Sequence, residues 1–321
     1  MSALLEVEGL TRHFAVTNSA GNSIGTVHAV TDVSFKIGAG ETLGLIGESG
    51  CGKSTVSKMV VRLVEPTRGA VVLEGEDINK VSFSRMKMLR KRVQMVFQDP
   101  FGSLDPRQAA EDIIAEPLLV HGMRSKSERR ARVVELMERV GLRADQMRNT
   151  PAAFSGGQRQ RIAIARALAL NPALIVADEP VSALDVSIQA QVVNLMVDIQ
   201  KELGLSYLFV SHDLGVIRHI SDRVAVMYLG RIVEIGRTSD LFANPGHPYT
   251  RTLMDALPKP NPARRLSKKR VPRGEIPSPL NPPTGCAFHP RCPLATDVCR
   301  QQLPALRPLA GGTQGACHHA A

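Results

Sequence analysis

The sequence contains no tryptophan, and only three tyrosines and nine phenylalanines occur among its 321 residues. Proteins that hold single-stranded nucleic acid stack bases on aromatic side chains, so this scarcity argues against such a platform. Apolar runs stay far below the ~18 residues of a bilayer-spanning helix. The first residues lack the basic and apolar regions of a secretory signal. We therefore expect a cytoplasmic chain without a membrane span.

Cysteine is also scarce, with five residues in the chain. In a reducing cytoplasm these residues are expected to be free thiols or metal ligands rather than disulfides. The net charge is +10, and seven basic residues without any acidic one lie between Lys259 and Arg273. This Pro-rich stretch is either a solvated linker or a surface for anionic lipid headgroups or an acidic partner.

Apolar runs alternate with helical patterns along most of the chain. Asn18 to Gly25 is rich in Gly, Ser and Asn and is predicted to be a loop between two strands. This alternation predicts an α/β core with a largely parallel sheet, interrupted by a helical insertion. After Ala256 the composition shifts to Pro, Arg and Lys, so we place a domain boundary there. Buried strands are predicted at residues 42–46, 93–97, 173–177, 207–210 and 224–228.

A glycine-rich loop lies between the apolar run 43–46 and the helical pattern 55–64. It matches the P-loop pattern, in which glycines let backbone N–H groups face phosphates. Lys53 is expected to neutralise the β- and γ-phosphates of ATP, and the Ser54 hydroxyl to coordinate Mg²⁺. Cys51 fills a variable position and is expected to have no redox role. The loop residues are Gly47, Glu48, Ser49, Gly50, Cys51, Gly52, Lys53, Ser54 and Thr55.

Polar side chains follow three of the predicted strands. Asp178 and Glu179 come directly after the run 174–177, where Asp178 is placed to hold Mg²⁺ and Glu179 to orient or deprotonate water. His212 follows the run 207–210 and is a candidate for contact with the γ-phosphate. Gln98 follows the run 93–97 and is placed to reach Mg²⁺ or the attacking water. Ligand sites of open α/β sheets lie at these strand ends.

A second phosphate-binding pattern occurs about a hundred residues after the P-loop. Ser155, Gly156, Gly157 and Gln158 open a long apolar helix, whose free N–H groups and positive dipole end favour anions. One ATP needs one such loop. The second loop therefore predicts that the chain completes the ATP site of another subunit.

These motifs stand in the order found in ATP-binding cassette (ABC) ATPases, which the chain resembles over residues 4–245. The resemblance implies a RecA-like P-loop core, an antiparallel β-subdomain and a helical subdomain at about 99–172, within a nucleotide-binding domain at 1–255. It also implies a head-to-tail dimer in which Ser155 and Gly157 bind the partner's γ-phosphate. Asp185, in Ser182-Ala183-Leu184-Asp185, would couple the two sites. Phe14 is the candidate for stacking on adenine, with an ordinary core aromatic as the alternative.

The remaining residues, 256–321, narrow the resemblance. Gly246-His247-Pro248-Tyr249-Thr250 and the stretch from Asn281 to Leu294 resemble the C-terminal extension of ATPase subunits of dipeptide and oligopeptide permeases. Four cysteines of this extension, Cys286, Cys292, Cys299 and Cys317, lack the close pairs of structural zinc sites and the spacing of ferredoxins. Soft thiolates still favour zinc or an iron–sulfur cluster over free thiols. The resemblance favours a [4Fe–4S] cluster, with zinc and thiols without a metal as the alternatives.

The expected function is ATP hydrolysis that energises an ABC importer of dipeptides or oligopeptides. The resemblance implies a second ATPase subunit, favouring a heterodimer, two transmembrane permease subunits and a periplasmic or lipid-anchored peptide-binding protein. The chain would then lie peripherally on the cytoplasmic face of the inner membrane and bind no nucleic acid. Nickel or other small solutes are alternative cargoes. A soluble ABC ATPase acting on nucleic acid or ribosomes is the other alternative, but such proteins commonly have two cassettes or a long coiled-coil insertion.

Overall fold

The computed structural model describes residues 3–19, 21–99, 102–256 and 274–320. The chain divides into two compact units, which are described separately. The first unit comprises residues 37–42 and 72–210 with the start of the chain up to Leu5. The second unit comprises residues 6–36, 43–71 and 211 onward.

The elements follow this division. The first unit holds β5 (Glu76–Asp77), α2 (Phe83–Leu89), β6 (Val93–Val96), α3 (Ala110–Val120), α4 (Lys126–Arg139), the 3-10 helices η1 (Ala144–Arg148) and η2 (Pro151–Ala153), α5 (Gly156–Leu168), β7 (Leu174–Asp178), α6 (Val186–Leu203) and β8 (Ser206–Val210). The second unit holds α1 (Lys53–Val60), α7 (Leu214–Ile220), β9 (Arg223–Tyr228), β10 (Arg231–Arg237), α8 (Thr238–Ala243), α9 (Pro248–Asp255), α10 (Asp297–Gln301), β11 (Arg307–Pro308), β12 (Gln314–Gly315) and most of β1 (Leu5–Thr17), β2 (Ser23–Ile37), β3 (Thr42–Ile46) and β4 (Arg68–Leu73).

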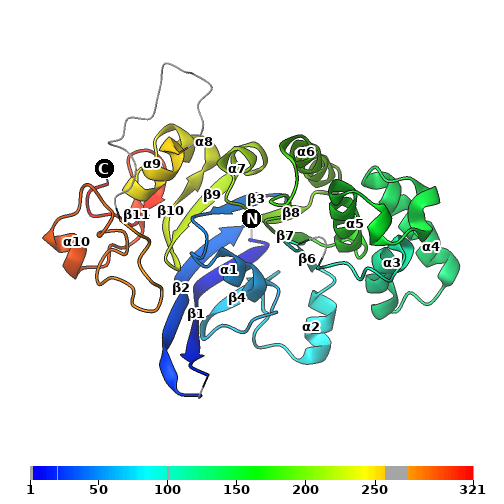
Figure 1. Ribbon diagram of the computed structural model, residues 1–321, viewed down its shortest axis with the longest axis horizontal. Helices are drawn as coiled ribbons and strands as arrows, with labels where there is room; N and C mark the ends of the chain where they lie inside the picture. Colours follow the sequence, from blue (N-terminus) through cyan, green and yellow to red (C-terminus); the bar gives the residue numbers. More distant parts are fainter. Residues whose placement is uncertain (1–2, 20, 100–101, 257–273, 321) are drawn as a thin grey trace. The chain divides into compact units, whose positions relative to one another are not determined.

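Parallel strands in the order β8-β7-β6 form the centre of the first unit. Every residue of β7 and β8 is buried, as expected of parallel strands that are covered on both faces. Because β6 and β7 are parallel, with Val96 opposite Ala177, the chain leaves both strands at the same edge. Helices α3, α4 and α5 pack on one another in the predicted helical insertion (Figure 1).

In the second unit, β3 pairs with β9 in parallel and β10 runs antiparallel to β9. Residues 274–320, here called the C-terminal segment, extend this sheet because β12 pairs with β10 and β11 pairs with β12. The N-terminal strands of the same unit form a separate sheet, in which they pair in the order β2-β1-β4. The P-loop strand and the C-terminal segment therefore belong to one compact unit.

The mixed parallel and antiparallel α/β architecture confirms the predicted fold class, and the five predicted buried strands are displaced by one residue at most. The loop predicted from Asn18 to Gly25 is too long, since β2 already begins at Ser23. The Asn18 N–H donates to the Asn22 carbonyl at 2.9 Å, so backbone hydrogen bonding closes this turn within five residues despite the polar sequence. The basic stretch Lys259 to Arg273 lies outside the described residues, and the boundary near Ala256 stays a prediction.

A buried carboxylate fastens the C-terminal segment to the sheet. Glu234 on β10 is fully buried, and its carboxylate accepts hydrogen bonds from the Gly246 N–H at 2.8 Å and the His247 N–H at 2.9 Å. The Thr313 hydroxyl donates to the same carboxylate at 2.9 Å. A buried charge is tolerated only with such partners. These three bonds therefore hold the loop before α9 and the C-terminal segment against β10.

His247 makes the stability of this region depend on pH. Its Nδ1 atom accepts the Tyr249 N–H at 3.0 Å and so caps α9, while burial lowers its pKa from 6.5 to about 4. Because the unfolded chain binds this proton more tightly than the folded chain, the folded state loses stability as the pH falls from about 6.5 to 4. The loss approaches about 3 kcal/mol at the lower limit.

Chemical denaturation at several pH values checks this expectation. His247→Asn keeps a capping acceptor but cannot titrate, so its stability should change less with pH between 6.5 and 4 than that of the wild type. Equal pH dependence in the two proteins would contradict the assignment to His247.

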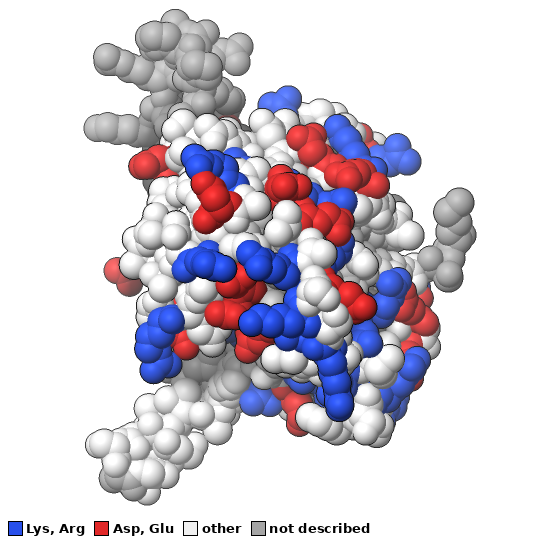
Figure 2. Space-filling view, turned by 90° about the vertical axis from the view of Figure 1, so that its right-hand side faces the viewer, with Lys and Arg blue, Asp and Glu red and all other residues white. Residues whose placement is uncertain are grey.

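The surface carries charges of both signs. On the face shown in Figure 2, Lys and Arg side chains stand beside Asp and Glu side chains rather than forming a patch of one sign. On α4, Glu135 pairs with Arg132 at 2.7 Å and with Arg139 at 3.5 Å. Among the described residues, no helix combines the length and apolar character that crossing a bilayer would require.

Candidate nucleotide-binding site

Two P-loop glycines are required by close approaches of the backbone. Gly47 has a φ of +155°, and a Cβ atom there would lie 2.3 Å from the Met227 carbonyl oxygen. Gly52 has a φ of +105°, and its Cβ would lie 2.2 Å from the Ala29 carbonyl oxygen. Residues other than glycine rarely adopt such backbone conformations. Gly52 also caps α1, so the free N–H groups of the first turn of this helix belong to the loop.

Lys53 is built into the P-loop rather than extended into solvent. Its side chain is buried, with the residue 4% exposed. The ammonium Nζ donates to the Gly47 carbonyl at 2.8 Å and to the Glu48 carbonyl at 3.1 Å. These bonds place a positive charge within the turn of the loop. An ammonium group held there suits the polyanionic phosphates of a nucleotide.

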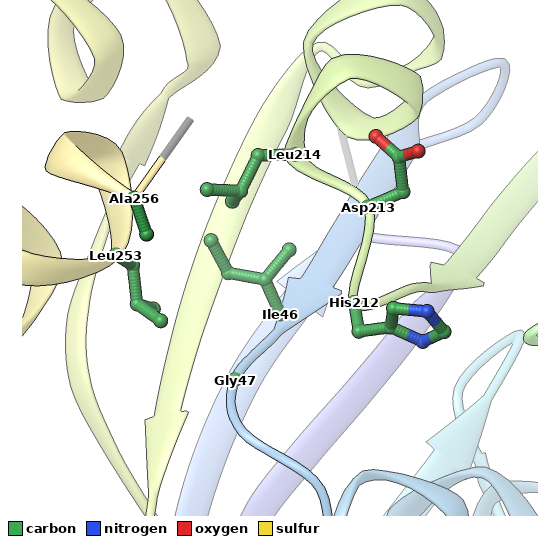
Figure 3. Close-up of a pocket in the computed structure, with 7 residues that line it drawn as sticks. All are labelled: Ile46, Gly47, His212, Asp213, Leu214, Leu253 and Ala256. Carbon is green, nitrogen blue, oxygen red and sulfur yellow. The ribbon is translucent and has the colours of Figure 1, made fainter. Parts of the chain in front are cut away.

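A cavity of about 320 Å³ lies next to the P-loop. In Figure 3, the side chains of Ile46, Leu214 and Leu253 point toward one another, whereas His212 and Asp213 point away from them. The cavity wall is therefore largely apolar and unsuited to phosphate. Its lining includes both Gly47 and His212, and the contact of His212 with the γ-phosphate stays a prediction.

Gln98 and Glu179 meet at the shared edge of β6 and β7. The Gln98 side-chain amide donates to the Glu179 carboxylate, with 3.1 Å between Nε2 and Oε2. Glu179 takes a left-handed conformation with a φ of +46°, and its N–H donates to the Val210 carbonyl at 2.9 Å. The preceding residue, Asp178, is buried at the end of β7. This arrangement gives two neighbouring carboxylates different environments, which suits one to a cation and the other to water.

The second predicted phosphate loop forms a capping box at the start of α5. The Ser155 hydroxyl accepts the Gln158 N–H at 3.4 Å, and the Gln158 side chain accepts the Ser155 N–H at 2.9 Å. Ser155 is exposed. A Cβ atom on Gly157 would lie 2.4 Å from the Ile188 side chain, so glycine is also needed here for packing against α6. Asp185 is the exposed N-cap residue of α6.

Phe14 lies half-buried on β1. The Arg12 guanidinium carbon lies 4.6 Å from the centre of its ring, which places a cation over one aromatic face. The role of Phe14 in stacking on adenine stays a prediction.

The predicted residues fall in two groups, one in each unit. The P-loop and His212 belong to the second unit, whereas the first unit contains Gln98, the carboxylate pair and the Ser155 loop. Residues 30–182 match the ABC transporter family, and residues 233–299 match the C-terminal region of oligopeptide/dipeptide transporters. The chain belongs to the ABC transporter ATP-binding proteins.

Relatives of this ABC protein align over nearly its whole length. The oligopeptide transport ATP-binding protein AppF of Bacillus subtilis is 50% identical, and the alignment covers 98% of this chain and 97% of the relative. The di/tripeptide transport ATP-binding protein DppF of Pseudomonas aeruginosa is 49% identical, with coverage of 100% and 98%. These alignments confirm the resemblance to the dipeptide and oligopeptide branch of the family.

Solved structures share the cassette fold. The ATP-binding cassette MJ0796, solved as a dimer in a post-hydrolysis state with ADP and Pi, has a TM-score of 0.65 and 29% identity. The match covers 73% of this chain and 98% of that chain. The cbiO1 structure from Clostridium perfringens, part of the ABC transporter complex cbiONQ, has a TM-score of 0.64 and 27% identity, with coverage of 76% and 92%.

The structure does not support the predicted iron–sulfur cluster or its zinc alternative. None of the four cysteines of the C-terminal segment forms a disulfide, and burial, aided by the neighbouring cysteines, raises the pKa of Cys286 to about 11. Cys299 Sγ lies 3.6 Å from the Thr296 hydroxyl, and Cys317 Sγ accepts the His319 N–H at 3.4 Å. Within the described ranges, no three His, Cys, Asp or Glu side chains form a group that could hold a metal ion.

Sequence reasoning missed the residues that fix Glu48, the second residue of the P-loop. The Glu48 N–H donates to the Tyr249 hydroxyl at 2.9 Å, and the Glu48 carboxylate pairs with Arg291. The P-loop pattern leaves position 48 variable and so gives no signal. Tyr249 and Arg291 do lie in the two stretches that resemble peptide permease ATPases, which was the only available clue.

Proposed function

We propose that this chain is the ATP-hydrolysing subunit of an importer of dipeptides or oligopeptides. The observation that carries the proposal is the pairing of a complete set of cassette motifs with a C-terminal region that matches oligopeptide/dipeptide transporters. The full-length similarity to AppF and DppF, which are named for oligopeptide and di/tripeptide transport, supports the choice of cargo. Nickel and other small solutes receive no comparable support.

The residues take distinct roles in this proposal. The P-loop N–H groups and Lys53 bind the phosphates of ATP, while Ser54 and Asp178 would hold Mg²⁺. When bound, Mg²⁺ would neutralise charge at the phosphates. Glu179 takes a proton from the attacking water, and Gln98 keeps its carboxylate oriented through their hydrogen bond. His212 contacts the γ-phosphate. The four cysteines have no role in this chemistry.

ATP is bound between two cassettes in this proposal. Ser155, Gly156, Gly157 and Gln158 face the nucleotide of a second ATPase subunit, and Asp185 links the two sites. The dimeric form of MJ0796 supports such an assembly. We favour a paralogous partner, two transmembrane permease subunits and a peptide-binding protein that delivers cargo. The chain would then act at the cytoplasmic face of the membrane.

Purification of the complex from its native membrane tests this proposal. We expect the chain to co-purify with membrane-spanning proteins and to hydrolyse ATP without added RNA or DNA. An ATPase that purifies without membrane proteins and requires nucleic acid would instead favour the soluble alternative.

Ser155→Ala tests the role of the second phosphate loop. We expect ATP hydrolysis by the complex to fall at least about tenfold, because the hydroxyl lost is a hydrogen-bond donor to a phosphate group. Loss of the helix cap alone should cost about 1 kcal/mol of stability.

Ser125→Ala is the matched control, because Ser125 caps α4 by accepting the Glu128 N–H at 3.3 Å. It should lower stability to a similar extent without changing hydrolysis. Equal hydrolysis by the two variants would mean that Ser155 is only a helix cap.

A further inference from the structure

Glu48 of the P-loop is held by an arginine from the far end of the chain. Arg291 Nη1 donates to Glu48 Oε2 at 2.8 Å, and Arg291 Nη2 donates to Glu48 Oε1 at 3.1 Å. The Arg291 side chain is only 7% exposed and that of Glu48 is 25% exposed. Two parallel bonds between a guanidinium and a carboxylate fix both position and orientation. This is a largely buried ion pair rather than a surface contact of small effect.

The backbone of Glu48 is fixed as well. Its N–H donates to the Tyr249 hydroxyl at 2.9 Å, and its carbonyl accepts the Lys53 ammonium at 3.1 Å. Lys53 therefore contacts the same residue that Arg291 holds through its side chain. The side chain, N–H and carbonyl of Glu48 each have a partner, so a shift of Arg291 would be transmitted to the loop that surrounds Lys53.

Arg291 is itself anchored in a tight turn of the C-terminal segment. The Arg291 N–H donates to the Phe288 carbonyl at 3.0 Å, and the Cys286 N–H donates to the Cys299 carbonyl at 2.8 Å. Gly285 permits this closure, because its φ is +65° and a Cβ would lie 2.5 Å from the Cys299 carbonyl oxygen.

Phe288 packs this turn of the C-terminal segment against aromatic residues near the P-loop. Its ring is 1% exposed, and its centre lies 5.2 Å from that of Tyr228 and 5.4 Å from that of Tyr249. Tyr249 is the same residue that accepts the Glu48 N–H. Phe288 and Arg291 therefore contact the P-loop region together, one through packing and the other through charge.

We propose that Arg291 is a positioning residue for ATP, through which the C-terminal segment sets the nucleotide affinity of the P-loop. Glu48 places a carboxylate in a loop that must receive a polyanion, and like charges at short range repel. Arg291 neutralises that carboxylate and turns it toward the C-terminal segment. Without Arg291, the Glu48 charge opposes the phosphates and the loop loses a restraint. This inference rests on the proposed binding of ATP by the P-loop.

The test compares Arg291→Gln, Glu48→Gln and the double variant in the purified complex, with KM and kcat for ATP and the Kd of a fluorescent ATP analogue as readouts. Arg291→Gln should raise KM and Kd about tenfold with kcat nearly unchanged. The double variant should recover most of the lost affinity, because the uncompensated carboxylate is gone. Higher salt should reduce the defect of Arg291→Gln by screening the charge.

Arg300→Ala is the control within the same segment, since Arg300 is 62% exposed and its nearest contact with Asp297 is 4.0 Å long. It should leave KM unchanged. If Arg291→Gln fails to fold, Arg291→Lys is used in its place. Its KM for ATP should rise about threefold, because one of the two hydrogen bonds to Glu48 is lost.

An unchanged KM in the folded variant, or a double variant as weak as Arg291→Gln, would overturn this proposal alone. A wild-type complex that neither binds nor hydrolyses ATP would overturn the proposed function as well. The two failures are thus distinguished by the wild-type assay.

Discussion

Replacing Glu179 with glutamine is expected to reduce ATP hydrolysis by at least about 100-fold, because a general base typically contributes that much or more. Glutamine keeps the size of the side chain and an oxygen that can accept the Gln98 amide, so the local geometry should persist. ATP binding depends on the P-loop and should be retained. The variant should therefore accumulate ATP-bound dimers, which size-exclusion chromatography with ATP and Mg²⁺ will detect.

Glu74→Gln provides the matched control in the same unit. Glu74 pairs with Arg92 at 2.7 Å on the surface, and neither residue belongs to a cassette motif. Its substitution should leave hydrolysis unchanged. Normal turnover by the Glu179 variant would show that another group activates the water.

Replacing Lys53 with alanine is expected to weaken ATP binding about 100-fold or more. Hydrogen bonds to charged groups contribute about 1.5–3 kcal/mol each, and the ammonium can make several with phosphate oxygens. The substitution also removes the bonds to the Gly47 and Glu48 carbonyls, so the loop loses an internal restraint. Equilibrium binding of a fluorescent ATP analogue measures the loss directly.

Lys58→Ala is the control for Lys53, since Lys58 lies exposed on the same helix, α1. Its affinity for the analogue should match that of the wild type. A thermal melt of each variant separates lost binding from lost folding. Wild-type affinity in a folded Lys53 variant would exclude this lysine as a phosphate ligand.

The sequence predicted the parts of the site that depend on local patterns. The P-loop glycines at positions 47 and 52 could be recognised because their left-handed conformations require glycine. The strand before Glu179 could be recognised because a continuous apolar run is typical of a buried parallel strand. In both cases, the signal lies within a few neighbouring residues.

Long-range contacts left no such signal. Arg291 and Glu48 lie 243 positions apart, and neither residue alone distinguishes an ion pair from an ordinary surface charge. The double role of Gly157 was likewise hidden, because the sequence does not show that Ile188 of α6 packs against it. The predicted metal ligands in the C-terminal segment were inferred from residue type, whereas a metal site also requires a convergent geometry that the described residues do not provide.

In the proposed transporter, this chain couples ATP hydrolysis to the import of short peptides. The ATPase rate of the complete transporter in lipid vesicles, with and without a peptide-loaded binding protein, tests this coupling. We expect the loaded binding protein to stimulate hydrolysis severalfold and the Glu179→Gln complex to remain inactive. Hydrolysis that does not respond to any dipeptide or oligopeptide, but does respond to another solute, would contradict the assignment of cargo.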